Sequence, residues 1–365
     1  MADAMEHYYA LIAAGGHGTR LWPMSRARMP KQMLPLIDDH SMARTSVERI
    51  ATLFPPERIF IVTGRELMND LKKEVGQIPP ENFIIEPYAK NTAPALALAL
   101  CYIQKRDPDA TVAILPADHH IVQREKFCRV LEAAWHVAQE GQIVTLGISP
   151  SHPATGFGYI QQGKALAEVN GFKVYRSHRF TEKPDIVRAT QFLASGQYSW
   201  NSGMFIWRVD RAMQDFERYQ PAIYAMCAYL QSAFEAPDYA TKLHDIWETM
   251  PRLSIDFAIM EKADNIAVIP NDFGWSDVGN WTSLYDILPQ DNFGNCVKGD
   301  ASDIRVILDT RDTLVLSDRL TVAIGVEDIV VVDTEDALLI CHKDRTQDVK
   351  QVVDYLRENG NEEYL

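Results

Sequence analysis

The stretch that decides the fold runs from Leu11 to Pro35 and reads LIAAGGHGTRLWPMSRARMPKQMLP. A short apolar segment ends at Ala14 and passes directly into Gly15, Gly16 and Gly18. Glycine tolerates positive φ angles, and it lets backbone N–H groups approach a phosphate with no Cβ in the way. The stretch therefore predicts a β-strand that ends in a phosphate-binding loop.

Two common phosphate-binding motifs are excluded by the residues after the glycines. A Walker A loop needs Gly-Lys-Ser or Gly-Lys-Thr after its second glycine, and neither is present here. A dinucleotide-binding GxGxxG loop would place a third glycine where Arg20 and Leu21 stand. The loop therefore belongs to another class of nucleotide-binding sequence.

The same stretch is strongly cationic in a chain whose formal net charge is −14. No acidic residue occurs between Glu6 and Asp38. The basic residues of this interval are Arg20, Arg26, Arg28 and Lys31. A solvated surface loop would explain the charges alone, but their position after a glycine turn favours a triphosphate, which arginine contacts as a fork and lysine as a point charge.

The composition is that of a globular protein of 365 residues, with 47% hydrophobic and 24% charged residues. Its 36 Lys and Arg against 50 Asp and Glu argue against binding to nucleic acid or to an anionic membrane, since either calls for a basic domain. The longest apolar run, 93–103, is shorter than the roughly 20 residues that span a bilayer. We expect no nucleic-acid and no membrane partner.

The start of the chain and its cysteines indicate a cytoplasmic location. No basic region followed by an apolar run occurs at the N-terminus, so no secretory signal is expected. The five cysteines form no CxxC pair, which argues against a zinc ribbon and against a disulfide framework. Reduced thiols in a cytoplasmic protein are the simplest expectation.

The first 150 residues alternate short apolar segments with helical patterns, which predicts a doubly wound α/β sheet. The expected strands are Tyr8–Ala14, Arg58–Gly64, Phe83–Pro87, Thr111–Asp118 and Gln142–Ile148. The expected helices are Ser41–Leu53, Arg65–Val75, Thr92–Lys105 and Arg124–Glu140. Ligands of such sheets bind beyond the carboxyl ends of the strands, where Gly15, Glu86 and Asp118 fall.

From residue 150 to residue 294 the pattern is mixed, and no linker rich in Gly, Pro or Ser interrupts it. The expected strands of this part are 156–160, Phe172–Phe180 and Met204–Arg208, and a helix is expected over Val209–Ala233. We therefore predict one catalytic domain over residues 1–294, built on a mixed sheet.

Residues 295–365 are expected to form a small C-terminal β domain with a terminal helix. Its short apolar runs are Ile304–Leu308, Leu314–Leu316, Thr321–Ile324, Ile329–Val332 and Ala337–Cys341. A meander or a β-helix would fit them, although no strict hexapeptide repeat is present. The terminal helix has an apolar stripe that must pack on the β domain or on a partner subunit, and its residues are Val349, Val352, Val353 and Leu356.

Two aspartates are candidate metal ligands. Asp118 follows an apolar strand, and Asp277 lies in the turn-rich segment Gly274–Gly279. Mg²⁺ takes one or two carboxylates together with waters and substrate phosphates, so two separated aspartates would suffice. Either aspartate alone would be explained as a turn former. His119 and His120 do not indicate zinc, because no second pair of His or Cys has metal-binding spacing.

Further polar residues at strand ends suit a sugar phosphate. Glu182 and Asn201 are of the types that hydrogen-bond sugar hydroxyls, and Lys183 is of the type that holds a phosphate. A surface ion pair between Glu182 and Lys183, and a turn role for Asn201, are the alternatives. Trp275 and Trp281 are expected to pack in the core rather than to stack on a sugar.

The set of motifs resembles the mannose-1-phosphate guanylyltransferases, also called GDP-mannose pyrophosphorylases. The motifs are, in sequence order, GGHGTRLWPMSRARMPKQ, EPYAKNTAPA, LPADHHI, GFGYI, FTEKP, WNSGMF and FGWSDVGNW. The resemblance extends from residue 8 to about residue 295, and the LWP, PKQ and NTAPA segments are similar to the guanylyl branch rather than to thymidylyl or uridylyl relatives. The C-terminal β domain is similar to that of the short forms. Too few residues remain for a cupin-type isomerase domain, so no isomerase activity is expected.

The resemblance implies roles for the residues around the nucleotide. The backbone around Ala13, Ala14 and Gly15 would contact guanine and ribose, with Asn91 and Thr92 closing the base pocket. The implied triphosphate-binding residues are Gly16, Gly18, Thr19, Arg20 and Lys31, of which Arg20 and Lys31 are the implied catalytic groups. His17 occupies a variable position of the loop, and no role is assigned to it.

The resemblance also implies a cofactor, a second substrate and a partner. Asp118 and Asp277 would bind Mg²⁺. The residues that would hold mannose 1-phosphate are Gly156, Glu182, Lys183 and Asn201. A homodimer is implied by analogy with the family.

The implied reaction transfers GMP from GTP to α-D-mannose 1-phosphate, giving GDP-mannose and pyrophosphate. A phosphate oxygen of the sugar phosphate attacks the α-phosphorus of GTP in line. Because this nucleophile is already an anion, no general base is needed, and catalysis rests on positioning and charge neutralisation. The open alternatives are a nucleotidylyltransferase for another sugar 1-phosphate or base, a non-catalytic regulator that binds nucleotide sugars, and a metal-dependent glycosyltransferase.

Overall fold

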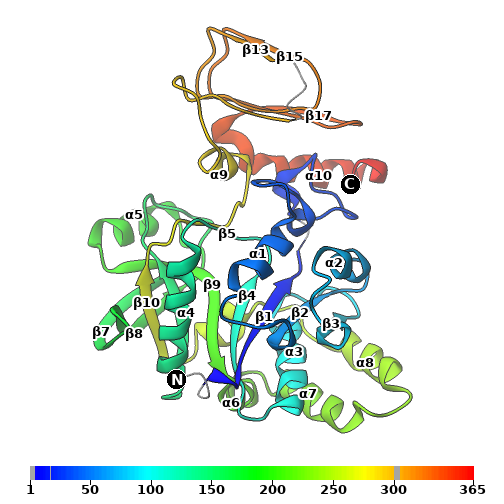
Figure 1. Cartoon of the computed structure of the whole chain (residues 1–365), viewed down its shortest axis with the longest axis vertical. Coiled ribbons are helices and arrows are strands. Elements are labelled where there is room, and N and C mark those ends of the chain that lie inside the picture. The colour runs from blue at the N-terminus through cyan, green and yellow to red at the C-terminus, as the bar shows by residue number, and fades with distance from the viewer. Residues whose placement is uncertain (1–4, 17, 300–304) are drawn as a thin grey trace. The chain divides into compact units, whose positions relative to one another are not determined.

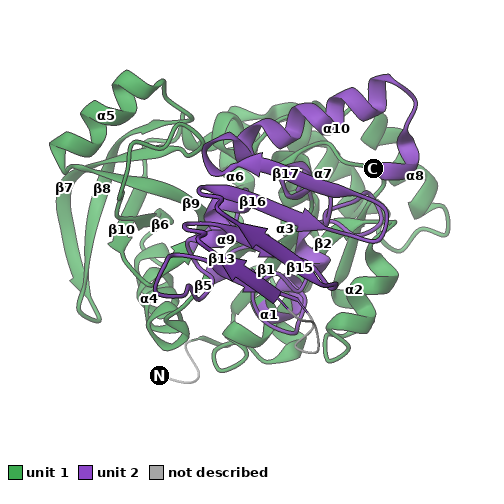
Figure 2. Ribbon diagram, turned by 90° about the horizontal axis from the view of Figure 1, so that it is seen from above, with its two compact units in different colours: residues 1–15, 46–117, 121–275 green, residues 16–45, 118–120, 276–365 purple. Residues whose placement is uncertain are grey.

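The computed structural model describes residues 5–16, 18–299 and 305–365 (Figure 1). His17, and Ile304 at the start of one expected strand, lie outside the described residues. By packing, the chain forms two compact units, which are coloured separately in Figure 2. Unit 1 comprises residues 1–15, 46–117 and 121–275, and unit 2 comprises residues 16–45, 118–120 and 276–365. Most of the cationic stretch therefore packs with the C-terminal part of the chain.

Unit 1 is built on a mixed sheet, which confirms the predicted fold class. Among the described residues its strand order is β3-β2-β1-β4-β9-β6-β10-β8-β7. The strands are β1 (Tyr8–Ala14), β2 (Ile59–Gly64), β3 (Phe83–Glu86), β4 (Thr111–Pro116), β6 (Ile143–Ile148), β7 (Tyr159–Val169), β8 (Phe172–Thr181), β9 (Tyr198–Arg208) and β10 (Ile266–Asn271). β1 is parallel to β2 and β4, and β9 runs antiparallel to β4 and β6.

The helices of this part of the chain include the four predicted before residue 150, with ends shifted by a few residues, and two that were not predicted, over Ile186–Ser195 and Tyr239–Glu248. They are α1 (Met42–Ile50), α2 (Met68–Glu74), α3 (Thr92–Arg106), α4 (Arg124–Ala138), α5 (Ile186–Ser195), α6 (Val209–Tyr219), α7 (Pro221–Ala233) and α8 (Tyr239–Glu248). The prediction of a single helix over Val209–Ala233 was wrong. The helix is interrupted at Gln220, whose φ is −141°, and a second helix begins at Pro221. A residue before proline avoids the helical conformation, and Pro221 has no N–H to continue the helix.

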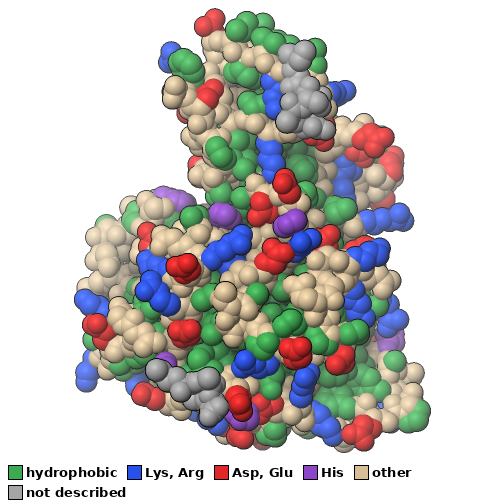
Figure 3. Space-filling model, in the orientation of Figure 1, with side chains coloured by type: hydrophobic (Ala, Val, Ile, Leu, Met, Phe, Trp, Pro, Cys, Tyr) green, Lys and Arg blue, Asp and Glu red, His purple; other side chains and the backbone are tan. Residues whose placement is uncertain are grey.

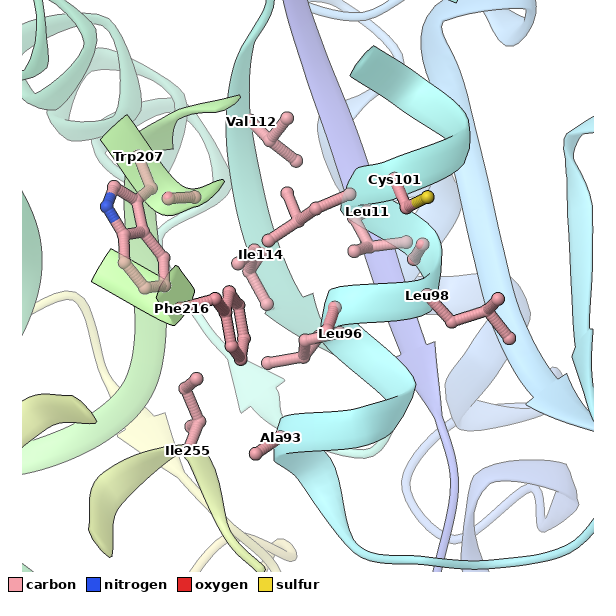
Figure 4. Packing of buried hydrophobic residues seen from close by; sticks show 14 of the residues in the cluster. Leu11, Ala93, Leu96, Leu98, Cys101, Val112, Ile114, Trp207, Phe216 and Ile255 are labelled. Carbon is pink, nitrogen blue, oxygen red and sulfur yellow. The ribbon is translucent and has the colours of Figure 1, made fainter. Parts of the chain in front are cut away.

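The core of unit 1 forms where α3 covers the sheet. Figure 4 shows Leu96 of this helix pointing toward Ile114 of β4 and Phe216 of α6, while Ala93 lies closer to Ile255. Fully burying a side chain of the size of Leu96 contributes about 1.5–3 kcal/mol. Because the central strands are covered by such helices, they read as continuous apolar runs in the sequence.

The C-terminal part of unit 2 is a β-helix, which decides between the two predicted alternatives. β12 (Cys296–Lys298), β14 (Leu314–Leu316) and β16 (Ile329–Asp333) are parallel neighbours, and β13 (Arg305–Leu308) is parallel to β15 (Thr321–Ile324). A meander would have paired successive strands antiparallel. Only β17 (Leu338–His342), at the end of the stack, pairs antiparallel with β16 among the described strands of this part.

The terminal helix α10 (Val349–Glu358) packs within its own unit. Val349 and Val353 are buried in a cluster that also contains Leu21 and Trp22 of the cationic stretch. Trp281, in α9 (Trp281–Tyr285), belongs to the same cluster, as predicted for a core tryptophan, and its Nε1 donates to the Trp22 carbonyl at 3.0 Å. The apolar stripe of the helix is therefore satisfied inside the chain.

The surface and the thiols agree with the expectations from composition. On the face shown in Figure 3, acidic and basic side chains of the described residues are interspersed. All five cysteines are free thiols, and four of them are buried. Within the described ranges, no helix combines the length and apolarity that crossing a bilayer requires.

Candidate functional site

The carboxyl ends of four parallel strands form one edge of the sheet in unit 1. The register places Ala14 beside Thr63, Ala13 beside Pro116, and Gly64 beside Glu86. The Ala14 side chain is buried, and Gly15 after it is exposed. Backbone groups and small side chains therefore lie at this end of the sheet, where Ala13, Ala14 and Gly15 are predicted to bind the nucleotide.

The start of α3 is an exposed and locally braced segment. Asn91 caps the helix in the left-handed region, with φ of 72°, and its Oδ1 accepts from the Thr92 N–H at 2.8 Å. Thr92 Oγ1 accepts from the Ile255 N–H at 2.8 Å. Asn91 and Thr92 are exposed. The segment assigned to the base pocket thus has a defined conformation and remains accessible.

Glu86 is a buried carboxyl group at the same edge. It is 7% exposed, and its Oε2 has no hydrogen-bond partner among the residues that the structure describes. Burial raises the pKa of Glu86 from its ordinary value of 4.5 to about 7, and a hydrogen bond from the Lys90 backbone opposes this only in part. An acid whose pKa is raised by folding stabilises the folded protein at low pH. That contribution is complete below pH 4.5 and is lost as the pH rises through about 7.

We expect Glu86→Gln to stabilise the protein increasingly as the pH rises. The variant cannot ionise, so relative to wild type it should gain up to about 3 kcal/mol of unfolding free energy between pH 5 and pH 8. Urea unfolding at both pH values measures this. Glu81→Gln, at an exposed position, is the matched control, and an equal pH response of the two variants would contradict the assignment.

The glycine loop in unit 2 needs glycine for two reasons at one position. Gly18 has φ of 61°, and a Cβ built on it would lie 2.5 Å from the Cβ of Lys31. Gly18 also caps the short helix η2 (Thr19–Leu21), which carries Arg20 with its side chain exposed. Gly16 has φ of 97° with open space around it. The loop therefore packs closely on Lys31 and leaves Arg20 accessible.

Lys31 connects the two candidate metal ligands. Lys31 is only 6% exposed, and its Nζ donates to Asp118 Oδ2 at 2.8 Å. The same Nζ also donates to the backbone carbonyl of Asp277. Three predicted site residues, far apart in the sequence, are thus brought together within unit 2.

The carboxylates of this group influence one another. Burial raises the pKa of Asp277, and the charge of Asp118 adds to this, while Lys31 and Arg20 oppose it. Burial would also raise the pKa of Asp118, but the charges of Lys31 and His119 outweigh it and the pKa is lowered. The mutual effect indicates that the two carboxylates lie close to each other and to Lys31.

The backbone around Asp277 is held in a demanding conformation. A Cβ on Gly279 would lie 2.7 Å from Asp277 Oδ2, and the Gly279 N–H donates to Asp277 Oδ1 at 3.2 Å. Val278 has φ of 46°, which is strained for a β-branched residue. Its side chain is fully buried, and this packing holds the strained turn in place.

The donor set fits a hard divalent cation. Among the residues that the structure describes, no group of three or more His, Cys, Asp or Glu side chains is placed to hold a metal ion. Asp118 and Asp277 are therefore the two candidate carboxylates, and most ligands of a bound cation would have to come from water and substrate. Mg²⁺ suits such a site, because it keeps waters and phosphate oxygens as its other ligands.

The basic residues of the loop do not share one role. Arg26 forms an ion pair with Asp336 at 2.7 Å, and its guanidinium lies 5.7 Å from the centre of the Trp22 ring. Arg20 and Arg28 are exposed. The charge of Arg26 is thus largely used to hold the loop, which the sequence pattern could not distinguish from phosphate binding.

The residues predicted for the sugar phosphate meet in unit 1 around one glycine. The register pairs Tyr159 with both Thr181 and Trp200, so Glu182 and Asn201 follow on either side of Gly158. A Cβ on Gly158 would lie 2.4 Å from Glu182 Oε2 and 3.2 Å from the Asn201 Cβ. The structure therefore brings Glu182 and Asn201 together.

Two residues that contact this group, Gly158 and Asp256, were not among the predicted site residues. Gly156 is exposed, with no atom within 4 Å of a Cβ built on it, whereas Gly158 touches Glu182. Asp256 was not singled out, although its Oδ1 accepts from Asn201 Nδ2 at 2.9 Å. Only the isolated acid in the apolar run SIDFAIM could have indicated it.

The Glu182 side chain is 8% exposed and is held at one oxygen only. Lys183 Nζ donates to Glu182 Oε1 at 2.7 Å, while the buried Oε2 has no hydrogen-bond partner among the described residues. Lys183 adopts φ of 44°, and its side chain is mostly exposed. The ion pair predicted as an alternative does exist, and it uses only one of the two Glu182 oxygens.

Comparisons with known proteins show the family to which the chain belongs. Residues 9–292 match the Nucleotidyl transferase family, and residues 303–356 match the MannoseP isomerase/GMP-like beta-helix domain. The Mannose-1-phosphate guanylyltransferase of Klebsiella pneumoniae is 39% identical over 97% of this chain and 75% of its own length. The Xanthan biosynthesis protein XanB of Xanthomonas campestris pv. campestris (strain B100) is 38% identical over 98% of this chain and 75% of its own.

A solved structure extends the agreement to the whole fold. The crystal structure of mannose-1-phosphate geranyltransferase from Thermus thermophilus is 33% identical, with a TM-score of 0.87, over 96% of this chain and 99% of that one. The matches extend over both the sheet-based part and the β-helix. The chain belongs to the nucleotidyl transferase family and, within it, to the mannose-1-phosphate guanylyltransferases.

Proposed function

We propose that the protein transfers GMP from GTP to α-D-mannose 1-phosphate and releases GDP-mannose and pyrophosphate. The observation that carries the proposal is the junction at Lys31, whose ammonium group joins Asp118 and Asp277 behind a glycine loop. Relatives named mannose-1-phosphate guanylyltransferase support the choice of substrates.

The nucleotide would be held by the loop and by the sheet edge before it. Backbone groups of Ala13, Ala14 and Gly15 would contact guanine and ribose, next to the braced start of α3 at Asn91 and Thr92 in the base pocket. The triphosphate would be held by Gly16, Gly18, Thr19, Arg20 and Lys31. Arg20 and Lys31 would neutralise the charge that accumulates as pyrophosphate leaves, which is where catalysis of this reaction gains most.

Asp118 and Asp277 would hold Mg²⁺ through their carboxylate oxygens. When bound, the cation supplies additional neutralisation of the phosphates. The chain's own contribution would be to keep the two carboxylates close to each other. The charge of Asp118 is one of the causes that raise the pKa of Asp277, after burial, which supports this closeness.

Mannose 1-phosphate would be held by Gly156, Glu182, Lys183 and Asn201. Glu182 offers a free buried acceptor to a sugar hydroxyl, and Lys183 offers an exposed cation to the phosphate. We further propose that residues 1–294 and 295–365 act as the catalytic and the C-terminal domain, a division supported by the two family matches.

The test is a turnover profile with purified protein and Mg²⁺. Pyrophosphate release should be fastest with GTP and mannose 1-phosphate among the four NTPs paired with several hexose 1-phosphates. Preference for another pair, such as dTTP with glucose 1-phosphate, would indicate a different nucleotidylyltransferase. Nucleotide-sugar binding without any turnover would indicate a regulator, and release of GDP from GDP-mannose with an acceptor would indicate a glycosyltransferase.

We also propose a homodimer that uses the β-helix. Leu308, Val322 and Ile324 lie on the parallel pair β13–β15 and are at least half exposed. Sedimentation at micromolar concentration should give a dimer, and the double variant Val322→Glu with Ile324→Glu should give a monomer, because burying the introduced charges is costly. A monomeric wild-type protein would contradict the proposal.

A further inference from the structure

A carboxylate outside the predicted set, Asp256, determines how one sugar-site residue is presented. It begins the π-helical turn η6 (Asp256–Met260), and its Oδ1 accepts from Asn201 Nδ2 at 2.9 Å. The other end of the same carboxamide is also held, because Asn201 Oδ1 accepts from the Gly203 N–H at 3.0 Å. The orientation of the Asn201 carboxamide is therefore fixed from both sides.

This orientation gives the site a donor next to an acceptor. A carboxamide nitrogen has two N–H groups, and Asp256 takes one of them. The other remains for a ligand, while the buried Glu182 Oε2 is a free acceptor. Glu182 Oε2 and the Asn201 Cβ both lie within 3.2 Å of the point that a Cβ on Gly158 would occupy. Turned over, the carboxamide would instead present its oxygen next to that of Glu182.

The segment that carries Asp256 is tied to its surroundings through the backbone. The Ala93 N–H donates to the Leu253 carbonyl at 3.0 Å, and the Leu253 N–H donates to the Lys90 carbonyl at 3.2 Å. The Ile255 N–H donates to Thr92 Oγ1 at 2.8 Å. Asp256 therefore follows a braced segment, which suits a group that must hold another side chain in place.

We propose that Asp256 is a positioning residue for the sugar phosphate, which keeps the Asn201 carboxamide donating to one ring hydroxyl while Glu182 accepts from its neighbour. The inference rests on the proposed function and deepens it. Two neighbouring hydroxyls satisfy such a site, because each hydroxyl both donates and accepts. Selectivity among hexose 1-phosphates then depends on a residue that need not touch the sugar.

The charges around Asp256 make the arrangement sensitive to pH. Burial raises the pKa of Asp256 to about 6, and the charge of Glu182 raises it further, while Lys183 and the hydrogen bond from Asn201 oppose the rise. Glu261, which directly follows η6, accepts from the Glu182 N–H at 3.3 Å and is a further acidic residue near this group. An ionised carboxylate is the stronger acceptor, so the hold on Asn201 should weaken as the pH falls through about 6.

The test compares two variants of Asp256. Asp256→Ala should raise KM for mannose 1-phosphate by roughly tenfold or more, because a hydrogen bond to a charged group is lost, and it should leave KM for GTP unchanged. Asp256→Asn retains an oxygen acceptor. Its neutral carbonyl is a weaker acceptor than a carboxylate, so its KM at pH 8 should lie between those of wild type and Asp256→Ala. Between pH 7 and pH 5 its KM should rise less than that of wild type, because only wild type also loses the charge of Asp256. Asp70→Ala, at a surface carboxylate, is the control.

The outcomes separate this inference from the proposed function. A folded Asp256→Ala enzyme with the wild-type KM for mannose 1-phosphate would overturn the positioning role and leave the function intact. A wild-type protein that releases no pyrophosphate from GTP and mannose 1-phosphate would overturn both. If Asp256→Ala does not fold, the pH profile of Asp256→Asn decides, since a rise in KM equal to that of wild type would overturn the role.

Discussion

Replacing Asp118 or Asp277 with asparagine is expected to lower kcat by about a hundred- to a thousandfold, the loss that accompanies removal of a principal electrostatic group from an active site. A neutral carboxamide keeps the shape of the side chain but not the charge that would hold a divalent cation. Because burial and the charge of its neighbour raise the pKa of Asp277, loss of the Asp277 charge should leave the fold intact. The pKa of Asp118 is lowered beside the buried Lys31, so its replacement should cost some stability as well.

The measurement is pyrophosphate release as a function of Mg²⁺ concentration, together with a thermal melt. Each variant should require more Mg²⁺ than wild type. Asp277→Asn should melt at a similar temperature to wild type, and Asp118→Asn, which leaves the buried Lys31 without its ion pair, should melt at a lower one. Asp344→Asn, whose side chain is 85% exposed in the same unit, is the matched control and should behave as wild type. Wild-type rates in both Asp118→Asn and Asp277→Asn would place the metal elsewhere.

Lys31→Met is expected to lower kcat by a comparable factor, on the order of a hundredfold, for a different reason. The variant removes the ammonium group that touches Asp118 and the Asp277 carbonyl, and that is proposed to contact a phosphate. Because the Asp118 side chain is 28% exposed, its lost partner should cost only about 1–2 kcal/mol of unfolding free energy, less than for a fully buried pair.

Metal dependence distinguishes the two groups of variants. Without the competing ammonium group, Asp118 is free for a cation, so Lys31→Met should need no more Mg²⁺ than wild type, whereas Asp118→Asn should need more. Lys73→Met, at an exposed lysine, controls for the loss of a charge. Lys31→Met with wild-type kcat would remove this residue from the proposed mechanism.

The elements of the sheet were predictable because burial on both faces leaves a clear pattern in the sequence. β1 has the predicted bounds, Tyr8–Ala14, and β4 ends two residues before its predicted end at Asp118. The helix over Val209–Ala233 failed because the apolar pattern continues through Pro221, whose local effect on the preceding residue overrides it. Local signals thus located elements well and missed one break.

Contacts between distant segments were predictable only through motifs. That Asp118 and Asp277 approach Lys31 is observed, but spacing alone does not show that Lys31 is buried between them. The choice between a meander and a β-helix depends on which strands pair, and pairing is a long-range property. Asp256 gave no periodic signal, because a single acid in an apolar run is typical of any half-exposed helix.

Packing of residues 16–45 with residues 276–365 has a consequence for exchanging parts between related enzymes. Leu21, Trp22 and Leu34 share one apolar cluster with Leu314 and Val330 of the β-helix, so the segment after the glycine loop packs against side chains encoded almost 300 positions later. A chimera that swaps only the C-terminal segment would set foreign side chains against this loop. Functional hybrids therefore have to inherit both segments from one parent.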